Sequence, residues 1–437
     1  MILHMNICLT NDSFPPTIDG VANVVLNYAK ELTAAGTQCT VVTPDYPGVT
    51  DNYDFPVVRF PSLDTTSLIG YRLGDPLNPD LVLDLAEKDY DLIHTHCPFA
   101  SMVLSRRLRN LIRKPLVFTY HTKYDIEIQR AVQGELLQKA AADILVRNIS
   151  ACDEVWAVSE GAGENLRQLG WQGEYIVMPN GVDLPKGRVS DDAVQALKQE
   201  YRIPSDRPVF LFVGRMMWYK GIRLILDGLK ILQENDYPFT MVFVGDGQEK
   251  QEIQDYAASL QLTDICRFTG SVYDRDRIRT WYCCGDLLLF PSSFDTNGLV
   301  VREASACGLA SVLIKGSCAA EGVTDAETGI LIEENAAALA AALQKLSVEQ
   351  MHILGEHAME RIYLSWEECV AHASARYAVI QEKWNRGEYP PKEELPSDDL
   401  LTFFKDVRDT RNEFRDDILL QYMKMREDFL NRIERYL

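Results

Sequence analysis

Short runs of hydrophobic and β-branched residues alternate with amphipathic segments along most of the chain. Residues 21–36 carry apolar side chains at helical spacing and end on Gly36, a common helix stop. Strands separated by helices predict βαβ units and a parallel sheet. In the first part of the chain the expected strands are residues 5–10, 38–44, 57–61, 91–96, 115–122, 154–159 and 175–180.

A second series of the same kind follows a polar segment at residues 187–208. Residues 221–235 form its clearest amphipathic helix. The two series share a pattern but are not a sequence repeat, so we expect two separate α/β domains at 1–185 and 186–365. The strands expected in the second domain are residues 208–215, 239–247, 265–272, 286–292, 310–316 and 329–333.

From Trp366 the chain becomes helical to its end at residue 437, apart from a proline-containing linker at 385–399. The final stretch, 400–437, has apolar residues three or four apart with charges between them. Its plain interpretation is a helix that docks on the body of the protein. A helix that mediates homo-oligomerisation is the functional alternative.

Composition narrows the classes of protein. The 437 residues are 46% hydrophobic and 25% charged, which is ordinary for a globular chain too long for one core. The formal net charge of −20 argues against nucleic acid as a partner. The N-terminus is typical of a buried strand and not of a signal peptide, and no apolar run approaches the ~20 residues that span a bilayer. The ten cysteines are scattered without metal or redox spacing, so we expect a cytoplasmic protein.

Two loops at strand ends carry candidate chemistry. The loop after the first strand, Asp12–Gly20, places Gly20 where a helix begins, so free backbone N–H groups there can face an anion. A glycine needed only for the turn is the structural alternative. After the first strand of the second domain, Arg215 and Lys220 are five residues apart and could neutralise a diphosphate together. Two solvated surface cations are the alternative there.

The strongest signal is the segment from Phe290 to Gly308. Asp295 follows a strand, and Glu303 lies one or two turns into the next helix. One carboxylate can therefore address sugar hydroxyls and the other a ribose diol. Gly298 admits a close approach of the backbone, and the helix N-terminus favours phosphate.

This segment resembles the E-x7-E signature of the retaining glycosyltransferases of family 4, which have the GT-B fold. The resemblance extends to about residue 380, and the order and spacing of the motifs make it specific. It implies two Rossmann-like domains that face each other across a cleft, with C-terminal helices that cross back and an extra helical tail. Further matching stretches are the Gly20 loop and residues 179–183, 214–221, 245–247 and 320–332.

The resemblance also implies roles for single residues. Arg215 and Lys220 would bind the diphosphate of a nucleotide-sugar donor, and Glu303 would hold its ribose hydroxyls. Asp295 and the backbone near Gly298 and Leu299 would hold the donor sugar. Gly20 would admit the phosphates, and His121 would lie against the transferred sugar.

Two departures from the family pattern flank the expected sugar pocket. The first carboxylate is aspartate, Asp295, where the family has glutamate, and Asn297 stands where the family usually has an aromatic residue. Asn297 is therefore a candidate contact to the sugar donor, and the identity of the sugar and of the nucleotide base stays open.

Two other groups need a chemical interpretation. His94 and His96 lie at a strand end of the first domain, and we expect them to contact the acceptor. Asp274-Arg275-Asp276 imitates the DxD motif of metal-dependent transferases but follows a strand of the second domain. We interpret this triplet as part of a loop that binds no metal. No carboxylate or cysteine is placed to complete a set of zinc ligands with the histidines. The prediction is therefore no metal and no cofactor, only a nucleotide sugar as co-substrate.

The acceptor is suggested by residues 101–114, a basic amphipathic segment in an acidic protein. Such a helix can lie on an anionic membrane surface at the inner face of a membrane. The neighbourhood also resembles family members that glucosylate diacylglycerol, so a membrane lipid is the preferred acceptor. The alternatives are a helix packed on the sheet with its arginines in water, and a soluble or polysaccharide acceptor.

Transfer with retained configuration is the expected reaction, because the leaving phosphate can take the acceptor proton and no covalent nucleophile is evident. A nucleotide-sugar epimerase would need further acid and base carboxylates. A non-catalytic nucleotide-sugar-binding relative remains an alternative because of Asp295 and Asn297. An NAD oxidoreductase is disfavoured because the glycine-rich fingerprint is missing.

Overall fold

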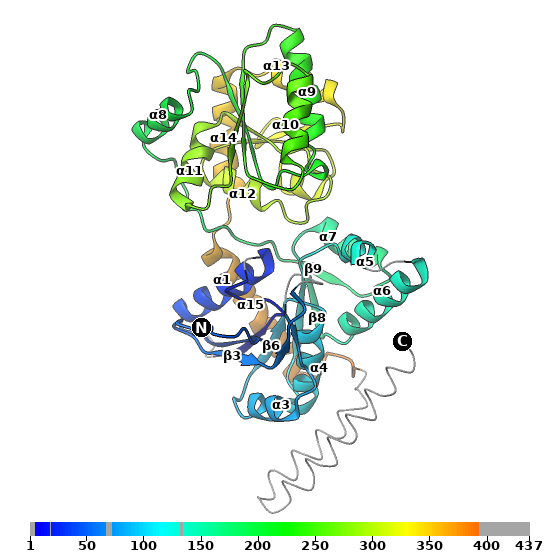
Figure 1. Cartoon of the computed structure of the whole chain (residues 1–437). Coiled ribbons are helices and arrows are strands. Elements are labelled where there is room, and N and C mark those ends of the chain that lie inside the picture. Colours follow the sequence, from blue (N-terminus) through cyan, green and yellow to red (C-terminus); the bar gives the residue numbers. More distant parts are fainter. Residues whose placement is uncertain (1–4, 18, 67–71, 132–133, 393–437) are drawn as a thin grey trace, which may run out of the picture.

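The computed structural model describes residues 5–17, 19–66, 72–131 and 134–392, and its fold is two α/β domains stacked end to end (Figure 1). The first domain contains a seven-stranded, wholly parallel sheet in the order β3-β2-β1-β6-β7-β8-β9. Its strands are β1 Asn6–Thr10, β2 Gln38–Pro44, β3 Val57–Phe60, β6 Leu92–Thr95, β7 Leu116–Tyr120, β8 Glu154–Ala157 and β9 Tyr175–Val177.

The second domain repeats this architecture with a six-stranded parallel sheet in the order β12-β11-β10-β13-β14-β15. Its strands are β10 Val209–Val213, β11 Thr240–Val244, β12 Cys266–Gly270, β13 Leu287–Leu289, β14 Ser311–Ile314 and β15 Ile330–Ile332. The expected strands of both domains are present. The sequence pattern missed only the two-residue antiparallel pair β4 Ser62–Leu63 and β5 Leu73–Gly74, which is too short to show a period.

Hydrophobic runs become central strands here because helices cover both faces of each sheet. All five residues of β10, VFLFV, are buried, and so are the five of β7, LVFTY. A strand buried on both faces has no polar alternation, which is why these runs are continuous in the sequence.

The helices of the first domain are α1 Gly20–Ala34, α3 Pro79–Ala86, α4 Ala100–Ile112, α5 Tyr124–Ala131, α6 Glu135–Ser150 and α7 Glu160–Gln168. Those of the second are α8 Asp191–Glu200, α9 Ile222–Glu234, α10 Lys250–Ser259, α11 Arg275–Cys284, α12 Leu299–Ala306, α13 Ala336–Gln344 and α14 Val348–Arg361, with 3₁₀ turns η1 Trp218–Lys220 and η2 Cys318–Ala320.

Helix α15, Trp366–Asn385, returns from the second domain to the first, as the GT-B resemblance implied (Figure 1). Ser365 caps its N-terminus in a capping box with Glu368. Its buried face, which includes Val370 and Tyr377, joins the core beneath α1 and β1. The expected docking or oligomerisation helix at 400–437 lies outside the described residues.

The prediction that the 101–114 helix presents its arginines to a membrane is wrong. Arg106, Arg107 and Arg109 of α4 are almost fully buried. Arg106 bonds the Asn148 side chain, Arg107 bonds the Pro76 carbonyl, and Arg109 forms a two-point ion pair with Asp153. The guanidinium groups link α4 to neighbouring segments by hydrogen bonds and an ion pair. They can do so because a planar group with several donors can satisfy several buried acceptors.

No helix in the described part of the chain is long and apolar enough to cross a membrane.

Candidate functional site

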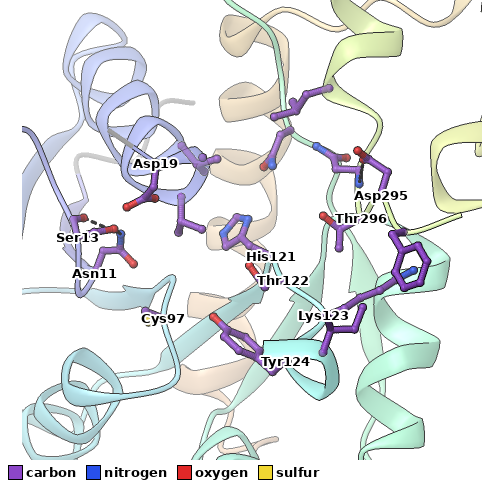
Figure 2. Close-up of a pocket in the computed structure, with 18 of the residues that line it drawn as sticks. Asn11, Ser13, Asp19, Cys97, His121, Thr122, Lys123, Tyr124, Asp295 and Thr296 are labelled. Carbon is purple, nitrogen blue, oxygen red and sulfur yellow. Dashed lines mark hydrogen bonds between the residues drawn. The ribbon is translucent and has the colours of Figure 1, made fainter. Parts of the chain in front are cut away.

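A cavity of about 510 Å³ lies between the two domains, and its walls come from loops at the carboxyl ends of strands in both sheets. In Figure 2, Asn11, Asp19 and His121 of the first domain lie on one side, and Asp295 of the second domain lies on the other. The residues that line it are Asn11, Asp12, Ser13, Asp19, Gly20, Val21, Val24, Cys97, Phe99, His121, Thr122, Lys123, Tyr124, Ile126, Asn180, Arg215, Tyr219, Lys220, Phe294, Asp295, Thr296, Asn297 and Leu299.

The cavity lies where the strand order of each sheet reverses. In the first sheet β1 is flanked by β2 and β6, and in the second β10 is flanked by β11 and β13. The loops that follow these strands diverge to opposite sides of the sheet and leave a crevice, which is where open α/β sheets bind ligands. The topology therefore accounts for the position of the site.

Lys220 and Asp295 meet in this crevice although they are 75 positions apart. Lys220 Nζ donates to Asp295 Oδ2 at 3.1 Å, and Asp295 Oδ1 accepts the backbone N–H groups of Gly298 (2.6 Å) and Asn297 (3.1 Å). Burial raises the pKa of the Asp295 carboxyl, but Lys220 and these two N–H groups outweigh burial and lower it from its usual value. Asp295 is therefore an ionised group that shapes the loop and holds the lysine.

Gly221 allows the Lys220 loop to lie against the Asp295 loop. Its φ is +80°, and a Cβ atom there would be 2.0 Å from the carbonyl oxygen of Pro291. No other residue fits that conformation and that contact at once. The glycine that follows Lys220 is thus what brings the ammonium into the crevice.

Arg215 supplies a second positive charge to the same wall. It follows β10, is exposed, and lines the cavity. Its guanidinium makes no ion pair with any residue of the described chain, whereas Arg109, Arg275 and Arg376 are each paired with a carboxylate. The two cations that the sequence predicted to act together lie on one wall of the cavity.

The N-terminus of α12 forms another part of that wall. Helix α12 begins at Leu299, after Gly298 in the left-handed conformation (φ +62°), so its first N–H groups have no partner within the helix. Asn297 is only 8% exposed, and both polar atoms of its amide lack a hydrogen-bond partner in the described structure. A buried amide without partners at a cavity wall is satisfied when a polar ligand occupies the cavity.

Across the crevice, Gly20 opens helix α1. Asp19 caps the helix by accepting from the N–H of Ala22 at 2.8 Å. A Cβ atom at Gly20 would meet nothing within 4 Å, so the glycine leaves room in the cavity without being required by the protein's own packing.

His121 follows β7 and lines the cavity. Its Nε2 is 3.0 Å from His96 Nδ1, and its Nδ1 has no partner within the described residues. Burial lowers the pKa of His121 to about 3, so the ring is neutral at physiological pH. A neutral imidazole can share a hydrogen bond with a sugar hydroxyl without repelling a positively charged transition state.

The prediction that His94 and His96 contact the acceptor is wrong in this arrangement. Both are fully buried, and neither lines the cavity. His94 shares hydrogen bonds with the Tyr377 hydroxyl of α15 (2.6 Å) and the Thr119 hydroxyl (2.7 Å). Strand alternation places His94 and His96 on the same face, where Tyr28 of α1 lies against both rings and Tyr377 of α15 lies against His94. His96 therefore holds the His121 ring in place through the hydrogen bond between the two rings.

Glu303 is on α12 but is not among the cavity-lining residues. Its carboxylate accepts from Arg275 Nη2 at 3.0 Å and from the Tyr282 hydroxyl at 2.7 Å. Arg275 belongs to the Asp274-Arg275-Asp276 sequence, in which Asp274 caps α11. The triplet thus organises Glu303 through Arg275. No group of three or more metal-ligating side chains is found in the described parts of the chain.

Several lining residues were not predicted. Asn11 follows β1, Tyr124 opens α5, and Asn180 is in a motif that matched the family without a role. Asp12 was named only as the start of the Gly20 loop. The signal that could have identified them is position alone: each follows the carboxyl end of a strand in the first sheet.

Family models match both domains. The model of the Glycosyltransferase Family 4 matches residues 18–186, and the model of Glycosyl transferases group 1 matches residues 194–361. Together they span both halves of the site.

Curated relatives match this chain over most of their own length. The chain is 24% identical over 309 residues to an alpha-monoglucosyldiacylglycerol synthase of Streptococcus pneumoniae, covering 70% of each chain. It is 24% identical to the protein of that name from Acholeplasma laidlawii, covering 76% of this chain and 85% of the relative. A D-inositol 3-phosphate glycosyltransferase of Streptomyces bingchenggensis is 28% identical, with 68% of each covered.

Solved structures share the fold. Sucrose-phosphate synthase from Thermosynechococcus elongatus superposes with a TM-score of 0.68 at 22% identity, covering 86% of this chain and 99% of that one. Anabaena HepE in complex with UDP-glucose superposes with a TM-score of 0.61 at 20% identity, covering 88% and 99%. With the two domain models, the relatives and the interdomain cavity taken together, this chain is a hexosyltransferase of glycosyltransferase family 4 with the GT-B fold.

Proposed function

We propose that this enzyme transfers a hexose, with retained anomeric configuration and without a metal ion, from a nucleotide-diphosphate sugar to a hydroxyl of a membrane lipid such as diacylglycerol. The observation that carries the proposal is the asymmetry of the cavity. One wall holds Arg215, Lys220 and the N-terminus of α12, and the other holds a neutral His121.

The cationic wall suits the diphosphate of the sugar donor. Arg215 offers a planar fork, Lys220 a point charge, and the first N–H groups of α12 a partial positive charge. These groups supply the charge stabilisation that a metal ion supplies elsewhere. Metal independence is thus supported by the number of cations, and it stays a prediction.

The proposed reaction breaks the bond between the sugar C1 and the β-phosphate oxygen and forms a bond between C1 and the acceptor oxygen. The acceptor proton passes to the departing phosphate. His121, with its free Nδ1, would hold a hydroxyl of the transferred sugar, and the unpartnered amide of Asn297 would hold another. Positioning and charge stabilisation supply the catalysis.

A lipid acceptor is supported by an apolar surface beside the cleft. On helix α6, Leu136, Leu137 and Ile144 are 82%, 61% and 56% exposed. Lys139 and Arg147 are exposed on the same helix, as are Glu135 and Asp143. Helix α6 packs against α5, whose Tyr124 and Ile126 line the cavity. Exposed apolar side chains at one helix surface fit the interface of a bilayer.

The names of the relatives point the same way. Two relatives are alpha-monoglucosyldiacylglycerol synthases, and one structural neighbour was solved with UDP-glucose. We therefore propose UDP-glucose as the first sugar donor to test and diacylglycerol as the first acceptor.

The test has two steps. Thermal unfolding is first measured against a panel of nucleotide diphosphates and nucleotide sugars, with and without EDTA, because a ligand of the folded state raises the unfolding temperature. A shift that EDTA does not change is the expected result. Transfer to diacylglycerol in anionic vesicles is then measured, with the anomeric configuration of the product determined by NMR. Absence of any shift would contradict the proposed sugar-donor site, and a shift without lipid product would contradict the proposed acceptor.

A further inference from the structure

Asp12 is a buried carboxyl group in the cavity that the sugar-donor site does not use. It lies in the loop after β1, is 3% exposed, and lines the cavity on the wall of the first domain. Its Oδ1 accepts the backbone N–H of Ser101, in the first turn of α4, at 2.7 Å. Its Oδ2 is buried and has no hydrogen-bond partner within the described residues.

An unpartnered carboxylate oxygen is energetically costly when it is buried. A buried carboxyl oxygen without a partner loses its hydration and gains nothing in return. Burial raises the pKa of Asp12, and the nearby donor groups of Cys97, Ser101 and Ala100 offset only part of that effect. A hydrogen-bond donor on a ligand would remove the penalty.

The neighbouring side chain shows the same deficit. Asn11 is 1% exposed, its amide nitrogen bonds Ser13, and its Oδ1 is also buried without a partner. Both unpartnered atoms are oxygens, so the ligand that satisfies them supplies hydrogen-bond donors, as the hydroxyl group of an acceptor does. The phosphates of the sugar donor supply acceptors and are drawn to the cations of the opposite wall, so they do not match this wall.

Capping of α4 does not by itself explain a carboxylate at this position. The cap uses one oxygen, Oδ1, and an asparagine side chain can accept from Ser101 in the same way. The second oxygen is what distinguishes aspartate from asparagine here, and it is the atom without a partner.

We propose that Asp12 binds the acceptor: its Oδ2 accepts a hydrogen bond from the acceptor hydroxyl and orients that oxygen toward C1 of the donor sugar. The inference rests on the proposed function, because it assumes a hydroxyl acceptor in this cavity. Asp12 orients the acceptor hydroxyl but does not take its proton. The proton passes to the departing phosphate as the bond from C1 to the phosphate oxygen breaks and the bond from C1 to the acceptor oxygen forms.

The experiment compares wild type, Asp12→Asn and the control Asn78→Ala. Asn78 caps α3 in the same domain, away from the cavity, so its loss tests the effect of a missing helix cap alone. Glucose transfer from UDP-glucose to 1,2-dioctanoylglycerol in mixed micelles is measured against acceptor concentration. Hydrolysis of UDP-glucose by water is measured without acceptor, and UDP-induced thermal shifts report folding and binding of the sugar donor.

The expected result is that Asp12→Asn lowers kcat/KM for the acceptor by about 10- to 100-fold, the range for a lost hydrogen bond to a charged group. Hydrolysis and the UDP shift should stay within about twofold of wild type, as in Asn78→Ala. Equal transfer by Asp12→Asn and wild type would overturn the inference and leave the proposed function intact. Equal losses of transfer and hydrolysis would also overturn it. Hydrolysis without transfer by the wild type would overturn the proposed acceptor, and the inference with it.

Discussion

At the scale of single residues, the cleft depends on charges and rings whose environments differ sharply. The carboxyl of Asp295 is kept ionised by Lys220 and two backbone N–H groups, while the ring of His121 is kept neutral by burial. The first arrangement holds a cation where phosphate would bind. The second keeps positive charge away from the sugar.

The two cleft cations provide the first prediction. We expect Arg215→Ala and Lys220→Gln each to lower kcat/KM for the sugar donor by about 10²-fold or more, because each removes a stabilising partner of the departing diphosphate. Steady-state kinetics with the donor varied is the measurement. Arg223→Ala is the matched control, since Arg223 stacks on Trp218 and Tyr256 outside the cavity. Unchanged turnover with only weaker donor binding would instead indicate a non-catalytic nucleotide-sugar-binding protein.

The buried histidines make stability depend on pH. Burial lowers the pKa of His121 to about 3, and burial with neighbouring rings lowers the pKa of His94 and His96 well below the usual value of about 6.5. Between pH 6.5 and 3 the unfolded chain therefore binds protons that the native chain does not. The free energy of unfolding should fall as pH falls through this window and be unaffected by these groups above it.

His121→Gln removes one of the three groups. Urea unfolding at several pH values should then show a slope that is shallower by up to about 1.4 kcal/mol per pH unit. His372→Gln, at an exposed ring on α15, is the control and should leave the slope as in wild type. A slope for His121→Gln equal to that of wild type would contradict the neutral, buried state of this ring.

At the scale of elements, the N-terminus of α7 touches the second domain. Glu321, just after η2, accepts the backbone N–H groups of Glu160 (2.6 Å) and Gly161 (2.7 Å). The Ser159 hydroxyl donates to the carbonyl of Thr296 (2.6 Å), a cavity-lining residue. A helix of one domain is thus capped by a carboxylate of the other, beside the loop expected to hold the sugar.

This contact should hold the cleft closed. We expect Glu321→Ala to raise KM for the sugar donor by about tenfold. The two hydrogen bonds to Glu321 exist only when the domains are closed, so their loss destabilises the closed state and leaves the open state unchanged. Small-angle scattering should show a larger radius of gyration with UDP bound than for wild type. Glu164→Ala changes another carboxylate of α7, which contacts Tyr175 and Arg167 of its own domain, and should alter neither value. Identical scattering for Glu321→Ala and wild type would exclude this role.

At the scale of the whole molecule, the surface beside the cleft decides how a lipid would reach the site. The arginines of α4 are inside the first domain, and the exposed apolar side chains are on α6. An acidic protein with a net charge of −20 needs such a local surface to approach an anionic membrane.

The α6 surface can be tested directly. We expect the double substitution Leu137→Glu and Ile144→Glu to reduce cosedimentation with anionic vesicles by about tenfold. The substitution removes apolar side chains that would insert into the membrane and adds negative charges that the anionic lipids repel. Val348→Glu with Ile353→Glu, on exposed apolar positions of α14 in the other domain, is the control. Loss of vesicle binding only in the α14 variant would place the membrane surface on the other domain.

Arg109→Gln should lower the unfolding temperature, since it leaves Asp153 buried without its cation.

Much of the architecture could be predicted because it is local. Continuous apolar runs with amphipathic segments between them imply parallel strands covered by helices, and glycines at Gly20, Gly221 and Gly298 mark the loops where a ligand or another backbone comes close. Arg215, Lys220 and Asp295 were predicted because they follow strands at short, characteristic spacings. These features depend on neighbours within one βα unit.

Only the tertiary structure decided which face of each element meets the cleft. A basic helix looks the same in sequence whether its arginines meet water or buried acceptors, and α4 buries them because Asp153, Asn148 and the Pro76 carbonyl come to it from distant segments. His94 and His96 lie at the end of a strand that points to the cleft, yet Tyr28 of α1 packs against both rings and Tyr377 of the distant α15 packs against His94. Asp12 became a candidate only when folding buried it at the cavity wall, with one oxygen bonded to Ser101 of α4 and the other without a partner. The sequence determines periodicity and turns through short-range sterics, whereas burial and partners depend on contacts between segments that the chain brings together only on folding.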